Sequence, residues 1–332
     1  MKWKEPLSIH HLTLTNRIVM PPMATRSASH GYIDDEICKY YQKRAEKGYL
    51  GLIITEHMYI DKQGKADPNQ ISISRNCDIA GLRQLTKGIH REGSTRVFAQ
   101  INHAGSMADP IVTRQQAVGP SPVLHPRQKQ SQVPPRELSV EEIQVLVAEY
   151  AAAAGRAKAA GYDGVEIHAA HGYLLNQFYS PLTNHRNDAY GCDTLEKRIH
   201  FHLQVIHAIR MVVGTAYPLA IRFGGCDYQP GGSTINEAVE AAKLFVTAGV
   251  DLIDVSGGMN FFIRPDHTEP GYFRDMSSAI RHNVSVPVLL TGGVQTVEEA
   301  EDLLVTGAAD MIGVGRAIFK DPGWPERELG KQ

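Results

Sequence analysis

The sequence predicts an α/β protein folded as a (β/α)8 TIM barrel. Two observations predict this fold class: short β-rich runs recur eight times along the 332 residues, and helix-compatible stretches separate most of them. Most runs are continuously apolar, as the strands of a parallel sheet buried on both faces are, and eight such strands close a barrel. We place the runs at residues 17–20, 51–56, 96–101, 164–168, 219–223, 252–256, 288–291 and 311–314.

Length and composition agree with one large globular unit. An α/β barrel of this length can be a single folding unit, and no Pro- or Ser-rich linker divides the chain, so we expect one domain over residues 1–332. The 34 basic and 36 acidic residues are dispersed and give a net charge of −2, which leaves no electrostatic footprint for nucleic acid or anionic lipid. The expected ligand is therefore a small molecule.

The sequence also indicates the cellular location of the protein. No apolar run near the amino terminus resembles a signal peptide, and no run approaches the roughly 20 apolar residues of a membrane span. The 4 cysteines are far apart and form no CxxC pair, which favours free thiols. We expect a cytoplasmic protein without membrane contact, and the sequence leaves a homo-oligomer open.

Start and stop signals mark the helices between the runs. Ser139 with Glu142, three residues on, forms a capping box before an Ala-rich helix that Gly161 ends, and Thr296 begins a second such helix. The longest irregular stretch, at about residues 103–138, is rich in proline. A loop of that length in a compact domain is usually functional, and after a third barrel strand it would lie over the active-site face. We interpret it as a lid.

Polar residues and glycines follow the carboxyl ends of the proposed strands. Because barrel enzymes carry their active sites at this end, a complete ring of such residues predicts the active-site face. The ring consists of Pro22, Met23 and Ala24 after the first run, Glu56 and His57 at the second, Gln100, Asn102 and His103 at the third, His168 and His171 at the fourth, Arg222 at the fifth, Gly257 and Gly258 at the sixth, Gly292 and Gly293 at the seventh, and Gly315 and Arg316 at the eighth.

Two parts of this ring indicate specific chemistry. Glycines of the last two loops let backbone N–H groups approach an anion, and Arg316 adds a cation, so these loops predict a phosphate site. At the fourth run, His168, His171 and Tyr173 bring together two imidazoles and a phenol, which can donate hydrogen bonds to a carbonyl oxygen, and the phenol can also deliver a proton. Bare turns and backbone-bonded histidines are the simpler alternatives. The HxxH spacing would also suit zinc, but no third ligand motif accompanies it, and we assign no metal.

Longer motifs carry a family resemblance along the whole chain. The most specific are LTNRIVMPPM at 14–23, AQINHAG at 99–105, EIHAAHGY at 166–173, NHRNDAYG at 184–191 and GVGR at 313–316. Together they resemble the old yellow enzyme family of NAD(P)H:flavin ene-reductases, in particular its thermophile-like bacterial branch. The resemblance implies a barrel that binds FMN and passes hydride from NADPH or NADH through the flavin to the activated C=C bond of an α,β-unsaturated carbonyl or nitro compound.

The resemblance also implies a role for each matching residue. The flavin ring would contact Pro21, Pro22, Met23 and Ala24, with Gln100 at its pyrimidine edge and Arg222 at its N1/O2 side, and the FMN phosphate would contact Gly292, Gly293, Gly315 and Arg316. His168 and His171 would hydrogen-bond the substrate oxygen, and Tyr173 would protonate the α carbon of the alkene.

The sequence departs from the family pattern at three positions near the expected flavin. Ala24 stands where relatives commonly have Cys or Thr, His57 where they have a small residue, and Arg26 where this branch has a substrate-binding Tyr. We therefore assign His57 to cofactor binding and Arg26 to substrate binding. Their effect on flavin potential and substrate range stays open.

Other functions would use some of the same residues. A flavin barrel of another reaction class, such as an amine or hydroxy-acid oxidase-like protein, would also need the phosphate loops and Arg222. A zinc-dependent barrel hydrolase would be built on His168 and His171, and a non-catalytic flavin-binding protein is a third alternative. The position of Tyr173, two residues after the histidine pair, favours reduction.

Overall fold

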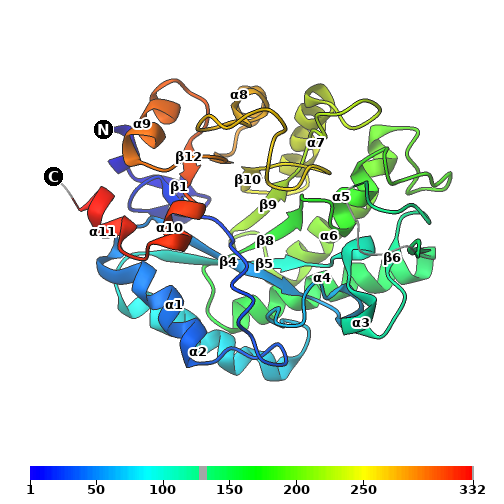
Figure 1. Cartoon of the computed structure of the whole chain (residues 1–332), viewed down its shortest axis with the longest axis horizontal. Helices are drawn as coiled ribbons and strands as arrows, with labels where there is room; N and C mark the ends of the chain where they lie inside the picture. The colour runs from blue at the N-terminus through cyan, green and yellow to red at the C-terminus, as the bar shows by residue number, and fades with distance from the viewer. Residues whose placement is uncertain (127–132, 331–332) are drawn as a thin grey trace.

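The computed structural model describes residues 1–126 and 133–330, and its central feature is a closed barrel of parallel strands (Figure 1). Each predicted run forms one strand and β12 pairs with β3 to close the barrel, so the predicted (β/α)8 fold is confirmed. In order around the barrel, the strands are β3 (Ile18–Met20), β4 (Leu52–Tyr59), β5 (Arg96–Asn102), β8 (Gly164–Ala169), β9 (Leu219–Phe223), β10 (Leu252–Val255), β11 (Val288–Thr291) and β12 (Met311–Gly313).

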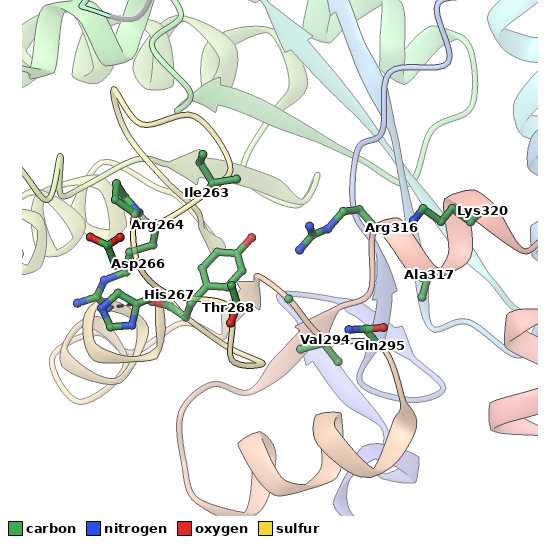
Figure 2. A pocket seen from close by; sticks show the side chains of 13 residues that line it. Ile263, Arg264, Asp266, His267, Thr268, Val294, Gln295, Arg316, Ala317 and Lys320 are labelled. Carbon is green, nitrogen blue, oxygen red and sulfur yellow. Dashed lines mark hydrogen bonds between the residues drawn. The ribbon is translucent and has the colours of Figure 1, made fainter.

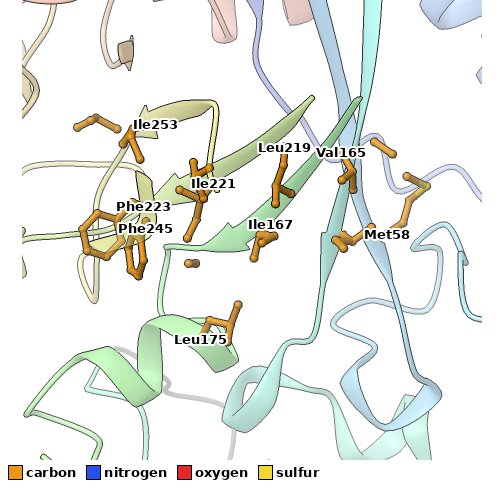
Figure 3. Close-up of a cluster of buried hydrophobic side chains, with 14 of the residues drawn as sticks. Met58, Val165, Ile167, Leu175, Leu219, Ile221, Phe223, Phe245 and Ile253 are labelled. Atoms are coloured by element: carbon orange, nitrogen blue, oxygen red, sulfur yellow. The ribbon is translucent and has the colours of Figure 1, made fainter. Parts of the chain in front are cut away.

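Alternate side chains of the strands pack into two separate apolar layers. Val19, Leu52 and Phe98 belong to a small cluster that fills the barrel interior, and the hairpin of β1 (Leu7–Ile9) and β2 (Leu12–Leu14) packs against it. Neighbouring strand residues face outward and join a larger cluster with the helices; Figure 3 shows this layer around β8, β9 and β10. Burial on both faces explains why the strands read as continuous apolar runs.

Helices cover the outside of the barrel. The capping boxes predicted at Ser139 and Thr296 are confirmed, and Thr234 with Glu237 forms a further one. The helices are α1 (Asp35–Ala45), α2 (Ile79–Arg91), α3 (Pro110–Thr113), α4 (Val140–Ala159), α5 (Leu174–Tyr179), α6 (Leu195–Val213), α7 (Ile235–Thr247), α8 (Arg274–Arg281), α9 (Val297–Val305), α10 (Arg316–Lys320) and α11 (Trp324–Leu329). In the described part of the chain, none of them is both long enough and apolar enough to cross a membrane.

The proline-rich stretch at 103–138 contains short elements rather than continuous irregular chain. Besides α3 it holds β6 (Val118–Gly119), which pairs in parallel with β7 (Arg136–Glu137); its residues 127–132 lie outside the described part. Three of its alanines form a small apolar cluster against which Tyr173 packs. The stretch therefore borders the predicted active site, and its role as a lid stays a prediction.

Candidate active site

A cavity of about 450 Å³ opens at the carboxyl end of the barrel. Residues from all eight strand ends and the loops that follow them line it, as the ring of polar residues predicts. The lining includes these predicted residues: Pro22, Met23, Ala24, Arg26, His57, Gln100, His168, His171, Tyr173, Arg222, Gly292, Gly293, Gly315 and Arg316. Pro21 is not among the lining residues. It lies next to Gly315, which does line the cavity, since a Cβ built on Gly315 would be 3.4 Å from Cγ of Pro21.

The turn after β8 brings three hydrogen-bonding side chains together. The ring of His168 lies 5.0 Å from the ring of His171 and 5.0 Å from that of Tyr173. His171 and Gly172 have φ angles of 59° and 69°, a left-handed pair that non-glycine residues rarely adopt. Side chains of α5 hold this turn, since Asn176 Oδ1 accepts the N–H of Gly172 and Gln177 Nε2 donates to its carbonyl oxygen.

Burial fixes the protonation of these three groups. It lowers the pKa values of His168 and His171 well below the usual range, and nearby Arg222 lowers both further. Both imidazoles are therefore neutral at pH 7, and each carries one N–H. Nε2 of His171 lies 2.7 Å from Oγ of Ser256, so His171 has its N–H on Nδ1 when the Ser256 hydroxyl donates to Nε2. Burial raises the pKa of Tyr173 to about 12, so its hydroxyl keeps its proton. The wall thus presents three neutral donors.

A buried group of charges lies behind Arg222. Nε of Arg222 is 3.2 Å from Oδ2 of Asp254, and Gln100 Nε2 donates to Oε2 of Glu166 at 2.7 Å. Burial raises the pKa of Asp254 to about 6 and that of Glu166 well above its usual range. Sequence reasoning missed both carboxyl groups; the available signal was an acidic residue inside an otherwise apolar strand.

These contacts leave polar atoms for a ligand. Because Gln100 donates to Glu166, its carbonyl oxygen is left for a donor in the cavity, such as the N3–H of a flavin. Nε of Arg222 faces Asp254, whereas its terminal nitrogens make only one long contact with the described residues, from Nη2 to Oγ of Ser256 at 3.5 Å, so their N–H groups are left for a ligand. A cation and an amide oxygen at this wall suit the N1/O2 and pyrimidine edge of a flavin, so the residues present fit the cofactor.

Glu56 and Arg26 organise the opposite side of the cavity. Glu56 accepts hydrogen bonds from the backbone N–H and hydroxyl of Thr25 at 3.0 and 2.6 Å, which ties the Met23–Ala24 segment to β4. Burial raises the pKa of Glu56 to about 7. Arg26 pairs with Asp67 at 3.2 Å and its side chain is 72% exposed, which places it at the rim of the cavity.

A second cavity, of about 550 Å³, continues from the glycine loops (Figure 2). It shares four lining residues with the first cavity, namely Tyr272, Gly293, Val294 and Arg316. Lys320, which sequence reasoning did not assign, lines it from the next turn of α10, and neither Arg316 nor Lys320 has an ion pair or hydrogen bond within the described residues. Two unpaired cations beside a glycine loop fit a phosphate group.

The backbone conformation of the glycine loop is also consistent with a phosphate site. Gly293 has a φ of 78°, and a Cβ there would lie 3.0 Å from the carbonyl oxygen of Glu269. Only glycine adopts this conformation without strain. Within residues 1–126 and 133–330, no group of three or more His, Cys, Asp and Glu side chains is arranged to hold a metal ion.

Comparison with known proteins shows the family of the chain. Residues 4–330 match the NADH:flavin oxidoreductase / NADH oxidase family. An "NADH oxidase" of Thermoanaerobacter brockii is 39% identical over 326 residues, which are 96% of this chain and 49% of that protein, so the chain spans about half the length of this relative. An "NADPH dehydrogenase" of Geobacillus thermodenitrificans is 36% identical over 98% of this chain and 94% of its own length.

A solved structure agrees with these relatives. The old yellow enzyme homologue from Zymomonas mobilis superposes with a TM-score of 0.85 at 29% identity, covering 98% of this chain and 91% of its own. The chain therefore belongs to the NADH:flavin oxidoreductase / NADH oxidase family, that of old yellow enzyme, and FMN and NAD(P)H are the cofactors that this membership implies.

Proposed function

We propose that the protein is an FMN-dependent ene-reductase, which uses NADPH or NADH to reduce the activated C=C bond of an α,β-unsaturated carbonyl or nitro compound. The observation that carries the proposal is the convergence of His168, His171 and Tyr173, three neutral donors whose neighbouring rings are 5.0 Å apart in one cavity wall. When bound, the flavin would supply the two-electron chemistry, accepting hydride from the nucleotide and delivering it to the alkene.

The residues that would hold FMN line the two connected cavities. Pro21, Pro22, Met23 and Ala24 would support the ring and His57 would contact it, Gln100 and Arg222 would bond its pyrimidine edge, and Gly292, Gly293, Gly315 and Arg316 would bind the phosphate, with Lys320 as an additional cation. Arg222 would also stabilise negative charge at the N1/O2 side. This assignment draws support from the cations of Arg316 and Lys320, which have no ion pair or hydrogen bond within the described residues.

The substrate would bind against the histidine pair. His168 and His171 would each donate an N–H to the carbonyl or nitro oxygen and so polarise the double bond, making the β carbon electrophilic. Tyr173 would donate its hydroxyl proton to the α carbon. Arg26, at the rim, would contact the part of the substrate that points to solvent.

Anaerobic half-reactions test the proposal. Purified protein should be yellow, should bleach with NADPH or NADH in the absence of oxygen, and should regain its colour when an enone, enoate, nitroalkene or quinone is added. Reoxidation by oxygen alone, with no alkene in the panel reduced, would favour the oxidase-like alternative. A colourless protein that cannot be loaded with FMN would refute flavin chemistry altogether.

A further inference from the structure

His57 lies at an irregular point of β4. The register between β4 and β5 shifts between Thr55 and Met58, and a β-bulge of this kind re-aims the side chains that it contains. Glu56 and His57 would point to opposite faces of a regular strand, yet both line the site cavity. The bulge thus adds an imidazole to the wall, with its ring 5.3 Å from that of Tyr173.

Amide groups hold one edge of this imidazole. Gln70 Nε2 lies 2.9 Å from Nδ1 of His57 and 3.1 Å from its carbonyl oxygen, and Asn102 Nδ2 lies 3.3 Å from the same Nδ1. The amide of Gln70 cannot be turned round, because its Oε1 accepts the backbone N–H of Ala66 at 2.8 Å. Gln70 therefore presents an N–H to Nδ1, and Nδ1 must be a hydrogen-bond acceptor.

A neutral imidazole whose Nδ1 accepts carries its proton on Nε2. Burial, with Arg26 nearby, lowers the pKa of His57 to about 4, so the ring is neutral at pH 7. Within the described residues, Nε2 has no hydrogen-bond partner. His57 therefore offers the cavity one N–H donor whose tautomer is fixed by Gln70.

We propose that His57 determines substrate specificity: its Nε2 donates to a second oxygen of the substrate while His168 and His171 hold the first. This inference rests on the proposed function of the site. A carbonyl oxygen has two lone pairs, and in the proposed function the N–H groups of His168 and His171, whose rings are 5.0 Å apart, would occupy both. The ring of His57 is 6.0 Å from that of His168, which suits an acceptor elsewhere on the ligand. The substrate class that fits is an alkene flanked by two carbonyl groups, such as a cyclic imide or an ene-dione.

The test uses FMN-loaded protein and two alkenes of the same ring size. 2-Methylmaleimide has two carbonyl groups and 2-methylcyclopent-2-enone has one. His57→Phe keeps a planar ring but removes the N–H, and it should lower the kcat/KM ratio of imide over enone about tenfold, the value of one hydrogen bond. His57→Gln returns a donor and should recover part of the ratio. Gln70→Leu, which frees the ring, should lower the ratio in the same direction.

Unreactive ligands supply a readout that needs no turnover. Succinimide and cyclopentanone bind without reacting, and their dissociation constants follow from the perturbation of the flavin absorption band. His57→Phe should raise the dissociation constant of succinimide about tenfold more than that of cyclopentanone. In parallel, ¹⁵N NMR of the parent should show His57 protonated at Nε2.

The outcomes separate this inference from the proposed function. The role of His57 would be overturned if His57→Phe left both the kcat/KM ratio of imide over enone and the relative affinity for succinimide and cyclopentanone unchanged. If the flavin midpoint potential shifted while both ratios stayed unchanged, His57 would act on the flavin and not on the substrate. If the parent protein reduces neither alkene, the proposed reaction fails. If His57→Phe nevertheless weakens the binding of succinimide, the binding role of His57 stands.

Discussion

Tyr173→Phe tests the proposed proton donor with little disturbance of the fold. The ring packs against Ala104, Ala108 and Ala117, and the hydroxyl has no hydrogen bond to any described residue, so phenylalanine keeps the packing and removes only the proton. We expect reduction by NAD(P)H to stay within about twofold of the parent. The oxidative half-reaction with cyclohexenone should fall by about 10²–10⁴, the range for a positioned proton donor, which equals roughly 2.7–5.4 kcal/mol of barrier.

Anaerobic stopped-flow spectroscopy of the flavin band measures each half-reaction separately. A nitroalkene is an internal control, because its nitronate product can leave unprotonated and should react at a nearly parental rate. Tyr32→Phe, on an exposed tyrosine outside the cavity, is the matched variant and should change neither half-reaction. An undiminished cyclohexenone rate in Tyr173→Phe would refute the assignment and move the proton source to water or another residue.

The pKa of Tyr173 gives this prediction a pH dependence. The hydroxyl proton is present below its raised pKa and is lost only as the pH rises toward about 12. The pKa values of His168 and His171 are lowered, so both rings stay neutral above pH 6. These three groups should therefore cause no titration of the oxidative half-reaction between pH 6 and 9. Glu56, with its pKa of about 7, can titrate in this window, so the test uses Glu56→Gln, and a titration between pH 7 and 9 that persists in this variant would contradict the assigned protonation states.

Three further perturbations address the rest of the site. His168→Ala or His171→Ala should weaken binding of p-hydroxybenzaldehyde and slow the oxidative half-reaction by about 10²–10³, and parental values in both variants would show that the pair is misassigned. Ala24→Thr should raise the flavin midpoint potential in a redox titration, because a hydroxyl near the flavin carbonyl would stabilise the reduced ring; no shift would show that the residue does not reach it. Gly293→Ala should weaken FMN binding in a fluorescence titration, and it should lower the free energy of unfolding by about 1–2 kcal/mol because residue 293 has a left-handed φ. The control Gly81→Ala, within α2, should have neither effect.

The barrel could be predicted because its signals are local. Each strand is an apolar run buried on both faces, and the capping boxes at Ser139 and Thr296 need only four consecutive residues. The active-site face followed from one geometric rule, that parallel strands of a closed barrel end on the same side. Residues as distant as Ala24 and Arg316 therefore came together as expected.

The contacts that tune the site could not be predicted, because they join segments far apart in sequence. Glu56 was visible at a strand end, but its bonds to Thr25 depend on how the loop after β3 crosses β4. Glu166 and Asp254 were hidden inside apolar strands, where periodicity does not separate a side chain at the barrel mouth from one in the core. Lys320 looked like an ordinary surface lysine until α10 placed it beside the second cavity.

His57 illustrates how far a residue type can be interpreted without its neighbours. The sequence shows an imidazole where relatives have a small side chain, which indicates added bulk near the flavin but not whether the ring donates, accepts or carries charge. That answer depends on Gln70, thirteen residues away, and on Ala66, whose N–H fixes the direction of the Gln70 amide. Because each hydrogen bond in this series permits only one orientation of the next, a backbone contact at Ala66 sets the proton position on a ring in the cavity wall. A substitution at Gln70 should therefore change substrate preference even where this side chain does not contact the substrate.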